Sequence, residues 1–334
     1  MIRLPKYTTL ILAFIAVYFI WGSTYLAIRI AIETMPPLTM LGFRFGVAGL
    51  IMLAWLTLRG VQWPSFSQWR TASMAGGLML FAGTGTVAVA LQYVPSGLAA
   101  LVITTVPLWM VLLNWLWKKG PRPTLLFFVG FFMGLIGVFL LVDPSAFLGT
   151  QTEGVIAIIA IMGGSVCWAV GSLYGRDADT PSDPFMATAI QMTMGGVILC
   201  LGGAMMGERI AFTAEMLTMR SLGAWLYLLI FGSFIAFSAY IWLMKNTSPA
   251  KVSTYAYVNP VIAVYLGWAF AGEPITPQII LASLLLVSAV VIVLRYGTAQ
   301  ERGKVRSPEP GVRSIEKKRR KWKFLGSGAR PKRA

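Results

Sequence analysis

The stretch TLILAFIAVYFIWGSTYLAI (residues 9–28) contains no charged side chain. A helix of about 20 residues rises roughly 30 Å, which is the thickness of the hydrocarbon core of a bilayer. Runs of similar length and composition recur at 38–58, 74–92, 97–117, 124–142, 154–174, 185–206, 222–244, 251–271 and 276–294. These runs lack the alternating pattern of barrel strands. The sequence therefore predicts an all-α polytopic membrane protein with ten transmembrane helices.

The composition excludes a soluble enzyme with one large core. Of the 334 residues, 57% are hydrophobic and only 12% are charged, whereas about 25% is usual in soluble domains. Histidine is absent, which excludes a His-containing triad, an HExxH zinc site and a His proton relay. Cys167 and Cys200 lie in apolar runs without metal-ligand spacing. We therefore expect no metal, no cofactor and no enzymatic activity, since an intramembrane enzyme would need convergent acids or a nucleophile–base pair at membrane depth.

The positive charge is concentrated at the C-terminal end of the chain. Of the 28 Lys and Arg residues, 14 lie between Arg295 and Ala334, together with three acids. If the N-terminus is cytoplasmic, the connections before this tail place ten basic residues inside and three outside, namely Arg29, Arg209 and Arg220. Lys and Arg gather on the cytoplasmic side of membrane proteins. Both termini are therefore predicted to be cytoplasmic.

The sequence also contains an internal repeat. A shift of 147 residues aligns Trp21 with Trp168, Pro37 with Pro184 and Gly49 with Gly196, and a shift of 153 aligns Ser96 with Pro249, Pro107 with Pro260 and Pro121 with Pro274. Because a repeat of five spans is odd-numbered, its second copy must enter the membrane from the opposite side. We expect two inverted five-helix repeats at 8–148 and 153–295, followed by a disordered basic cytoplasmic tail at 296–334.

Three stretches resemble a known family. They are WGSTYLAIRIAIETMPPLTMLGFRFGVAG (21–49), VPSGLAALVITTVPLWM (94–110) and SPAKVSTYAYVNPVIAVYLGWAFAGEP (248–274). They are similar to the EamA-type drug/metabolite transporter (DMT) superfamily, above all to its YedA-like bacterial inner-membrane branch, and the resemblance covers nearly all of residues 8–295.

The resemblance implies a multi-pass protein of the bacterial cell inner membrane, with ten helices in two inverted EamA repeats. It also implies secondary transport by alternating access through a cavity between the repeats, with export of amino acids, related metabolites or drugs. The family includes nucleotide-sugar and sugar-phosphate carriers, so uptake or exchange of such solutes is the alternative. A receptor or scaffold without transport activity would gain nothing evident from an inverted repeat.

Polar and aromatic side chains inside the spans are the candidates for substrate binding. Proline inside a helix frees a backbone carbonyl, and breaks at matched positions of two repeats point to a transport site. The candidates lie in the first, fourth, sixth and ninth spans: Trp21, Ser23, Tyr25, Thr104, Thr105, Pro107, Trp168, Ser172, Tyr255, Tyr257, Asn259 and Pro260. For the aromatic residues near span ends, interfacial anchoring or packing is the competing interpretation.

Charged residues near the spans add three more candidates. Arg44 lies inside the second span, where a cation must find carbonyls, a partner or an anionic substrate. A purely structural arginine remains the alternative. Arg29 and Glu33 are four residues apart on one helix, so they are expected to pair, either as a gate or coupling element or as an interfacial ion pair. The expected mid-span positions hold no Asp or Glu, which leaves proton antiport without an evident carrier.

The tail carries the run KKRRKWKF (317–324). A cytoplasmic polybasic segment with aromatic residues suits anionic lipid headgroups. The partners we expect are therefore a small-molecule substrate and membrane lipid, with no nucleic acid, and a homodimer is the assembly considered.

Overall fold

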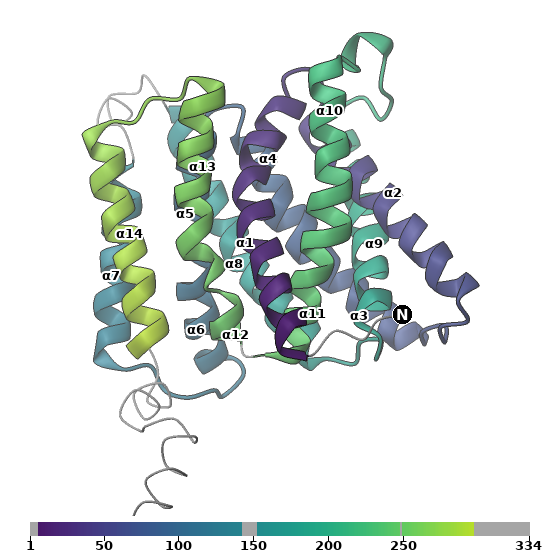
Figure 1. The fold of residues 1–334 in the computed structure, drawn as a ribbon, viewed down its shortest axis with the longest axis horizontal. Coiled ribbons are helices and arrows are strands. Elements are labelled where there is room, and N and C mark those ends of the chain that lie inside the picture. The colour runs from purple at the N-terminus through teal and green to yellow at the C-terminus, as the bar shows by residue number, and fades with distance from the viewer. Residues whose placement is uncertain (1–5, 142–151, 248, 297–334) are drawn as a thin grey trace, which may run out of the picture.

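The computed structural model describes residues 6–141, 152–247 and 249–296. The described residues form helices and no β-strand, and the helices lie side by side in one bundle (Figure 1). The first half of the chain contains α1 (Lys6–Ala31), α2 (Pro37–Leu58), α3 (Phe66–Gly76), η1 (Gly77–Gly85), α4 (Thr86–Ala90), α5 (Ser96–Ile103), α6 (Val106–Leu116) and α7 (Leu125–Leu140). The second contains α8 (Thr152–Asp177), α9 (Pro184–Met205), η3 (Ala214–Met216), α10 (Met219–Tyr227), η4 (Leu228–Phe237), α11 (Ser238–Asn246), α12 (Pro249–Val252), α13 (Tyr255–Ala271) and α14 (Pro277–Tyr296).

Seven continuous helical segments within the described ranges are long and apolar enough to cross a membrane. They are Tyr7–Ala31, Pro37–Leu58, Phe66–Ala90, Ser96–Leu116, Thr152–Asp177, Pro184–Met205 and Met219–Asn246. Three shorter apolar helices, Leu125–Leu140, Val258–Ala271 and Pro277–Val293, overlap the fifth, ninth and tenth runs of the sequence. The all-helical membrane fold is thus confirmed, while the count of ten spans and the cytoplasmic termini stay predictions.

Corresponding helices of the two halves pack against each other. The pairs are α2 with α9, α5 with α13 and α7 with α14, and Figure 1 shows the α2–α9 pair and the α7–α14 pair at opposite ends of the bundle. The α2–α9 contact is close because glycines line it. A Cβ on Gly49 would lie 2.4 Å from the backbone nitrogen of Thr193, and one on Gly196 would lie 2.5 Å from that of Gly46. Small residues allow this approach of two backbones in membranes.

The third span begins earlier than its apolar pattern indicates. The apolar run starts at 74, but the helix starts at Phe66. The Ser65 side chain accepts a hydrogen bond from the Gln68 backbone, and the Gln68 side chain accepts one from the Ser65 backbone. This reciprocal cap holds the first turn of α3, which hydropathy alone does not detect.

A carboxylate from the second half caps a helix of the first half. The α9 helix ends at Met205. Gly207, which has a φ of 83°, and then Glu208 follow it. Its carboxylate accepts hydrogen bonds from the backbone nitrogens of Leu38 (3.1 Å) and Thr39 (2.7 Å), in the first turn of α2. A negative group at a helix N-terminus satisfies free N–H groups and the helix dipole.

Glu273 repeats this arrangement one helix pair further along. Gly272 ends α13 with a φ of 65°. The Glu273 carboxylate then accepts hydrogen bonds from the backbone nitrogens of Ser96 (2.7 Å) and Gly97 (3.0 Å), at the start of α5. A Cβ on Gly267 would lie 2.3 Å from this carboxylate, so only glycine leaves it room. This interaction joins the two halves of the chain.

The fourth and ninth spans are both interrupted, but not at matched positions. Between α5 and α6, the hydroxyls of Thr104 and Thr105 donate to the carbonyls of Leu101 (2.6 Å) and Val102 (2.9 Å), just before Pro107. These bonds satisfy carbonyls at the break.

In the ninth span the break falls between Val252 and Tyr255, and Pro260 lies inside the continuous helix α13. The Thr254 hydroxyl donates to the carbonyl of Lys251 (2.6 Å) and tightens this turn. The 153-residue shift that aligns the two repeats places this break opposite residues 100–101, whereas the break in the fourth span lies at 104–105. The prediction of proline breaks at matched positions is therefore wrong. A hydroxyl–carbonyl bond lies at each break.

We predict that Glu208→Ala lowers the free energy of unfolding by about 1–2 kcal/mol, because two backbone N–H groups of α2 lose their charged acceptor. Denaturant unfolding of the detergent-purified protein measures this change. Glu215→Ala is the matched control, since Glu215 is exposed in the short helix η3. Equal stability of the two variants would show that the cap contributes nothing.

Candidate functional site

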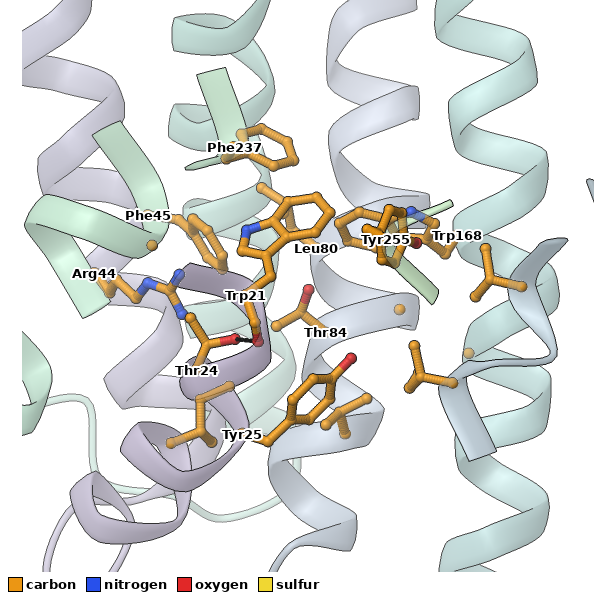
Figure 2. Close-up of a pocket in the computed structure, with 17 residues that line it drawn as sticks. Trp21, Thr24, Tyr25, Arg44, Phe45, Leu80, Thr84, Trp168, Phe237 and Tyr255 are labelled. Carbon is orange, nitrogen blue, oxygen red and sulfur yellow. Dashed lines mark hydrogen bonds between the residues drawn. The ribbon is translucent and has the colours of Figure 1, made fainter. Parts of the chain in front are cut away.

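A cavity of about 80 Å³ lies between the two halves of the bundle. Its walls come from α1, α2, η1, α4, α5, α6, α8, η4 and α13. The lining residues are Trp21, Thr24, Tyr25, Ile28, Arg44, Phe45, Leu80, Gly83, Thr84, Val87, Ile103, Val106, Gly164, Trp168, Gly232, Phe237 and Tyr255. Figure 2 shows Trp21 between Arg44 on one side and Trp168 and Tyr255 on the other. We call this space the central cavity.

Trp21 is the centre of an aromatic cluster. Its ring centroid lies 5.5 Å from that of Trp168 and 5.4 Å from that of Tyr255, both in edge-to-face geometry, and 4.9 Å from that of Tyr240. Aromatic pairs at these distances stabilise each other beyond their buried area. The Tyr240 hydroxyl accepts a hydrogen bond from Trp168 Nε1 (3.2 Å) and shares another with Ser172 Oγ (2.7 Å). The two repeat-related tryptophans therefore meet at the cavity.

One face of α1 lines the cavity. Trp21, Thr24, Tyr25 and Ile28 follow the helical spacing of three, four and seven residues. Trp21 and Tyr25 are among the residues predicted from the sequence, whereas Thr24 and Ile28 are not. Helical periodicity applied from Trp21 would have found both.

Arg44 is the charged residue among the 17 that line the cavity. Its side chain is buried, and Nε donates to Ser233 Oγ at 2.9 Å. The guanidinium carbon lies 4.4 Å from the ring centroid of Phe45, which gives a cation–π contact. A Cβ on Gly232 would lie 2.5 Å from Arg44 Nη2, so Gly232 makes room for the guanidinium.

The third span of each half contains a π-helical segment beside the cavity. These segments are η1, with nine residues, and η4, with ten. π-helical turns are rare and frequently occur at functional sites. Thr84 lines the cavity from η1, and Gly232 and Phe237 line it from η4. Gly83 and Thr84 line the cavity and are not among the residues predicted from the sequence.

Several predicted site residues lie away from the cavity lining. Ser23 Oγ donates to the carbonyl of Ile20 (2.7 Å) and lies 2.5 Å from the Tyr227 hydroxyl. Thr104, Thr105 and Pro107 are buried at the α5–α6 break.

Asn259 lies in α13. When its side-chain NH₂ faces the backbone carbonyls of Tyr255 and Tyr18, it donates a hydrogen bond to each, at 3.2 Å and 2.8 Å. Asn259 therefore joins α13 to α1. Pro260 follows it within the helix, and the side chain of Tyr257 lies outside the described part of the structure. Trp21, Tyr25, Arg44, Trp168 and Tyr255 are the predicted residues that meet at the central cavity.

Ser172 belongs to a narrower space of about 10 Å³, which lies on the other side of Tyr240 and is also lined by Arg176, Gln191 and Lys245. Gln191 is the repeat counterpart of Arg44 by the 147-residue shift. A third hollow, of about 520 Å³, lies between η1, α4 and α8. Its walls are apolar apart from Thr86, Tyr93 and Glu153. The central cavity has more of the polar and aromatic groups that could orient a solute.

The expected Arg29–Glu33 pair does not form. Arg29 Nη1 donates to the carbonyls of Leu91 and Val94, the latter at 3.1 Å, just past the end of α4. Glu33 instead lies 3.2 Å from Arg220 of α10. The carbonyls at the end of α4 lack helical partners, and the Arg29 guanidinium supplies donors to them.

We predict that Arg29→Ala lowers the free energy of unfolding by about 1–3 kcal/mol, because it leaves partly buried carbonyls without a charged donor. Arg220→Ala is the comparison: its ion pair is exposed, so the loss should stay below about 1 kcal/mol. Denaturant unfolding of both purified variants gives the difference. A larger loss in Arg220→Ala would mean that the Glu33 contact, and not the α4 cap, holds this end of α1.

The fold and the cavity define a class of protein: a two-repeat helical membrane bundle whose halves enclose a polar and aromatic cavity, as in membrane carriers. The chain belongs to the EamA-like transporter family, whose model matches residues 8–143 and 155–295. It is 41% identical to the uncharacterized inner membrane transporter YedA of Escherichia coli K12 over 282 residues, which cover 84% of this chain and 89% of that protein. The chain is accordingly a multi-pass inner membrane protein.

More distant relatives extend the likeness. The uncharacterized transporter YvbV of Bacillus subtilis is 26% identical over 307 residues, covering 90% of this chain and 95% of that protein. The chloroplastic WAT1-related protein At3g02690 of Arabidopsis thaliana is 25% identical over 291 residues, which cover 83% of this chain and 68% of that protein. One protein of known crystal structure has a TM-score of 0.62 at 21% identity, covering 91% of this chain and 100% of that chain, which shows the fold alone.

Proposed function

We propose that this protein is a secondary transporter that exports small metabolites, such as amino acids or related compounds, or drugs. The solute passes through the central cavity by alternating access. The observation that supports this most directly is the convergence of both halves on one cavity, where Trp21 and Trp168 meet. Two inverted halves around a midplane site provide related conformations that open to opposite sides.

The size of the cavity supports a conformational change during transport. Its volume of about 80 Å³ is smaller than the roughly 300–1,000 Å³ of most small-molecule sites. The described conformation is therefore contracted around the site, and the bundle must widen to admit a solute. The π-helical segments η1 and η4 flank the cavity from both halves and are the elements we assign to this widening.

Uptake or exchange of sugar-phosphate or nucleotide-sugar solutes is the weaker alternative. Phosphate groups are bound by several cations or by bidentate arginine clamps. The central cavity supplies Arg44 as its charged lining residue, which is too little positive charge for a phosphorylated solute.

Two further proposals concern partners. The basic tail, whose residues from 297 onward lie outside the described part of the structure, binds anionic lipid headgroups through the run at 317–324. The assembly proposed is a homodimer, which chemical cross-linking in native membranes would test.

Filling the central cavity should abolish export without unfolding the protein. Thr84 lines the cavity from η1, and a tryptophan there would occupy the space that a solute needs. Val129→Trp is the matched control, because Val129 is exposed on the outside of α7. We expect small solutes to accumulate in the medium of cells that produce wild type or Val129→Trp. Cells that produce Thr84→Trp at the same level in the membrane should show no such accumulation.

Metabolite profiles of medium and cytosol measure this directly. Solutes depleted from the medium by wild type would instead favour uptake. Unchanged export by Thr84→Trp would contradict a pathway through the central cavity.

A further inference from the structure

Arg44 places a positive charge in the central cavity that the surrounding protein does little to satisfy. Nε donates to Ser233, and the guanidinium face lies against Phe45. Guanidinium carries N–H donors on all three nitrogens. Nη2 lies beside Gly232, and Arg44 lines the cavity. A buried charge is costly unless it is paired. The cavity is therefore built to receive an acceptor with negative charge.

The acids of the described residues lie away from the central cavity. They lie at helix ends or in connections: Glu33, Glu153, Asp177, Asp179, Asp183, Glu208, Glu215 and Glu273. The described ion pairs involve Lys118, Arg176 and Arg220, and none of them includes Arg44. No acid lines the central cavity within the described ranges. The counter-charge for Arg44 must therefore come from a ligand.

The rest of the cavity determines the body of this ligand. Trp21, Tyr25, Trp168, Phe237 and Tyr255 surround the space with aromatic rings. Such walls favour an apolar or aromatic body by burial and ring contacts. They offer no carboxylate to an ammonium group, so the positive end of a zwitterion would lose its hydration without an ionic partner.

We propose that the central cavity selects monoanionic carboxylates with an aromatic or branched apolar body, and that Arg44 is the residue that determines this selectivity. The inference rests on the proposed transport function and narrows its substrate class. One planar guanidinium matches one carboxylate through paired hydrogen bonds. A dianionic phosphate would leave a charge unpaired, and a zwitterionic amino acid would leave its ammonium unpaired.

The narrower space beyond Tyr240 has the same charge preference. Arg176 and Lys245 line it, and no acid is among its described lining residues. Lys245 Nζ donates to the carbonyl of Pro181, and Arg176 Nε lies 3.9 Å from Asp177. Both cations border this narrower space. An anion in either space would therefore meet positive charge.

Binding to the purified full-length protein in nanodiscs tests the proposal without requiring transport. The probes are 3-phenylpropionate, its neutral primary amide 3-phenylpropanamide, and L-phenylalanine, with Kd measured by calorimetry. We expect wild type to bind the carboxylate at least about tenfold more tightly than the other two, since hydrogen bonds between charged groups exceed neutral ones by this order. Arg44→Gln should bring the carboxylate to the affinity of the amide. Arg59→Gln, at the exposed end of the same helix, is the charge-matched control and should leave the preference intact.

A second variant keeps the positive charge of Arg44 but displaces its guanidinium group. Gly232→Ala forces Arg44 Nη2 to shift, whereas Gly223→Ala, earlier in the same span, meets nothing within 4 Å. We expect Gly232→Ala to reduce the carboxylate preference several-fold and Gly223→Ala to preserve it.

Equal wild-type affinity for carboxylate and amide, tighter binding of L-phenylalanine, or no binding of any probe would overturn the proposal. Arg44-dependent binding of the carboxylate by a protein that moves no solute would support this selectivity and contradict the transport function alone.

Discussion

Backbone and side-chain polar groups inside a bilayer must find partners within the protein, and the rest of this structure depends on that constraint. Helices satisfy most of the backbone, and the remaining groups lie at helix ends and breaks. The carboxylates of Glu208 and Glu273 satisfy N–H groups of α2 and α5, and the Arg29 guanidinium satisfies carbonyls at the end of α4. Because both carboxylates come from the second half and cap helices of the first, end-capping also joins the halves.

The same constraint applies to the buried side chain of Arg44. Arg29 and Lys245 donate to backbone carbonyls, and Glu208 and Glu273 accept from helix N-termini. Arg44 instead has a hydroxyl and an aromatic face at the edge of a cavity. A cation at membrane depth with few partners in the protein is a candidate site for a ligand of opposite charge. The aromatic cluster around Trp21 makes the surroundings of that position less polar than water, which strengthens the interaction of the charge with a ligand.

The sequence was sufficient for the all-helical membrane fold and for several residues of the candidate site. Apolar runs of bilayer length predicted the helices, and the repeat-related Trp21 and Trp168, with Arg44, predicted residues that meet at the cavity. The missing parts depend on tertiary contacts. Arg29 was paired with Glu33 by helical spacing, but unpaired carbonyls at the end of α4 compete for it. The π-helical segments have no pattern in hydropathy, and the breaks beside Pro107 and before Pro260 follow hydroxyl–carbonyl bonds that spacing does not reveal.

The central claim is that one cavity between the halves opens alternately to the two sides of the membrane. Thr84→Cys, in a chain whose Cys167 and Cys200 are replaced by alanine, places a thiol in the cavity wall. The measurement is its reaction with a membrane-impermeant thiol reagent in right-side-out and in inside-out vesicles. The account predicts labelling in both orientations. Labelling in one orientation alone, or in neither, would contradict alternating access through this cavity.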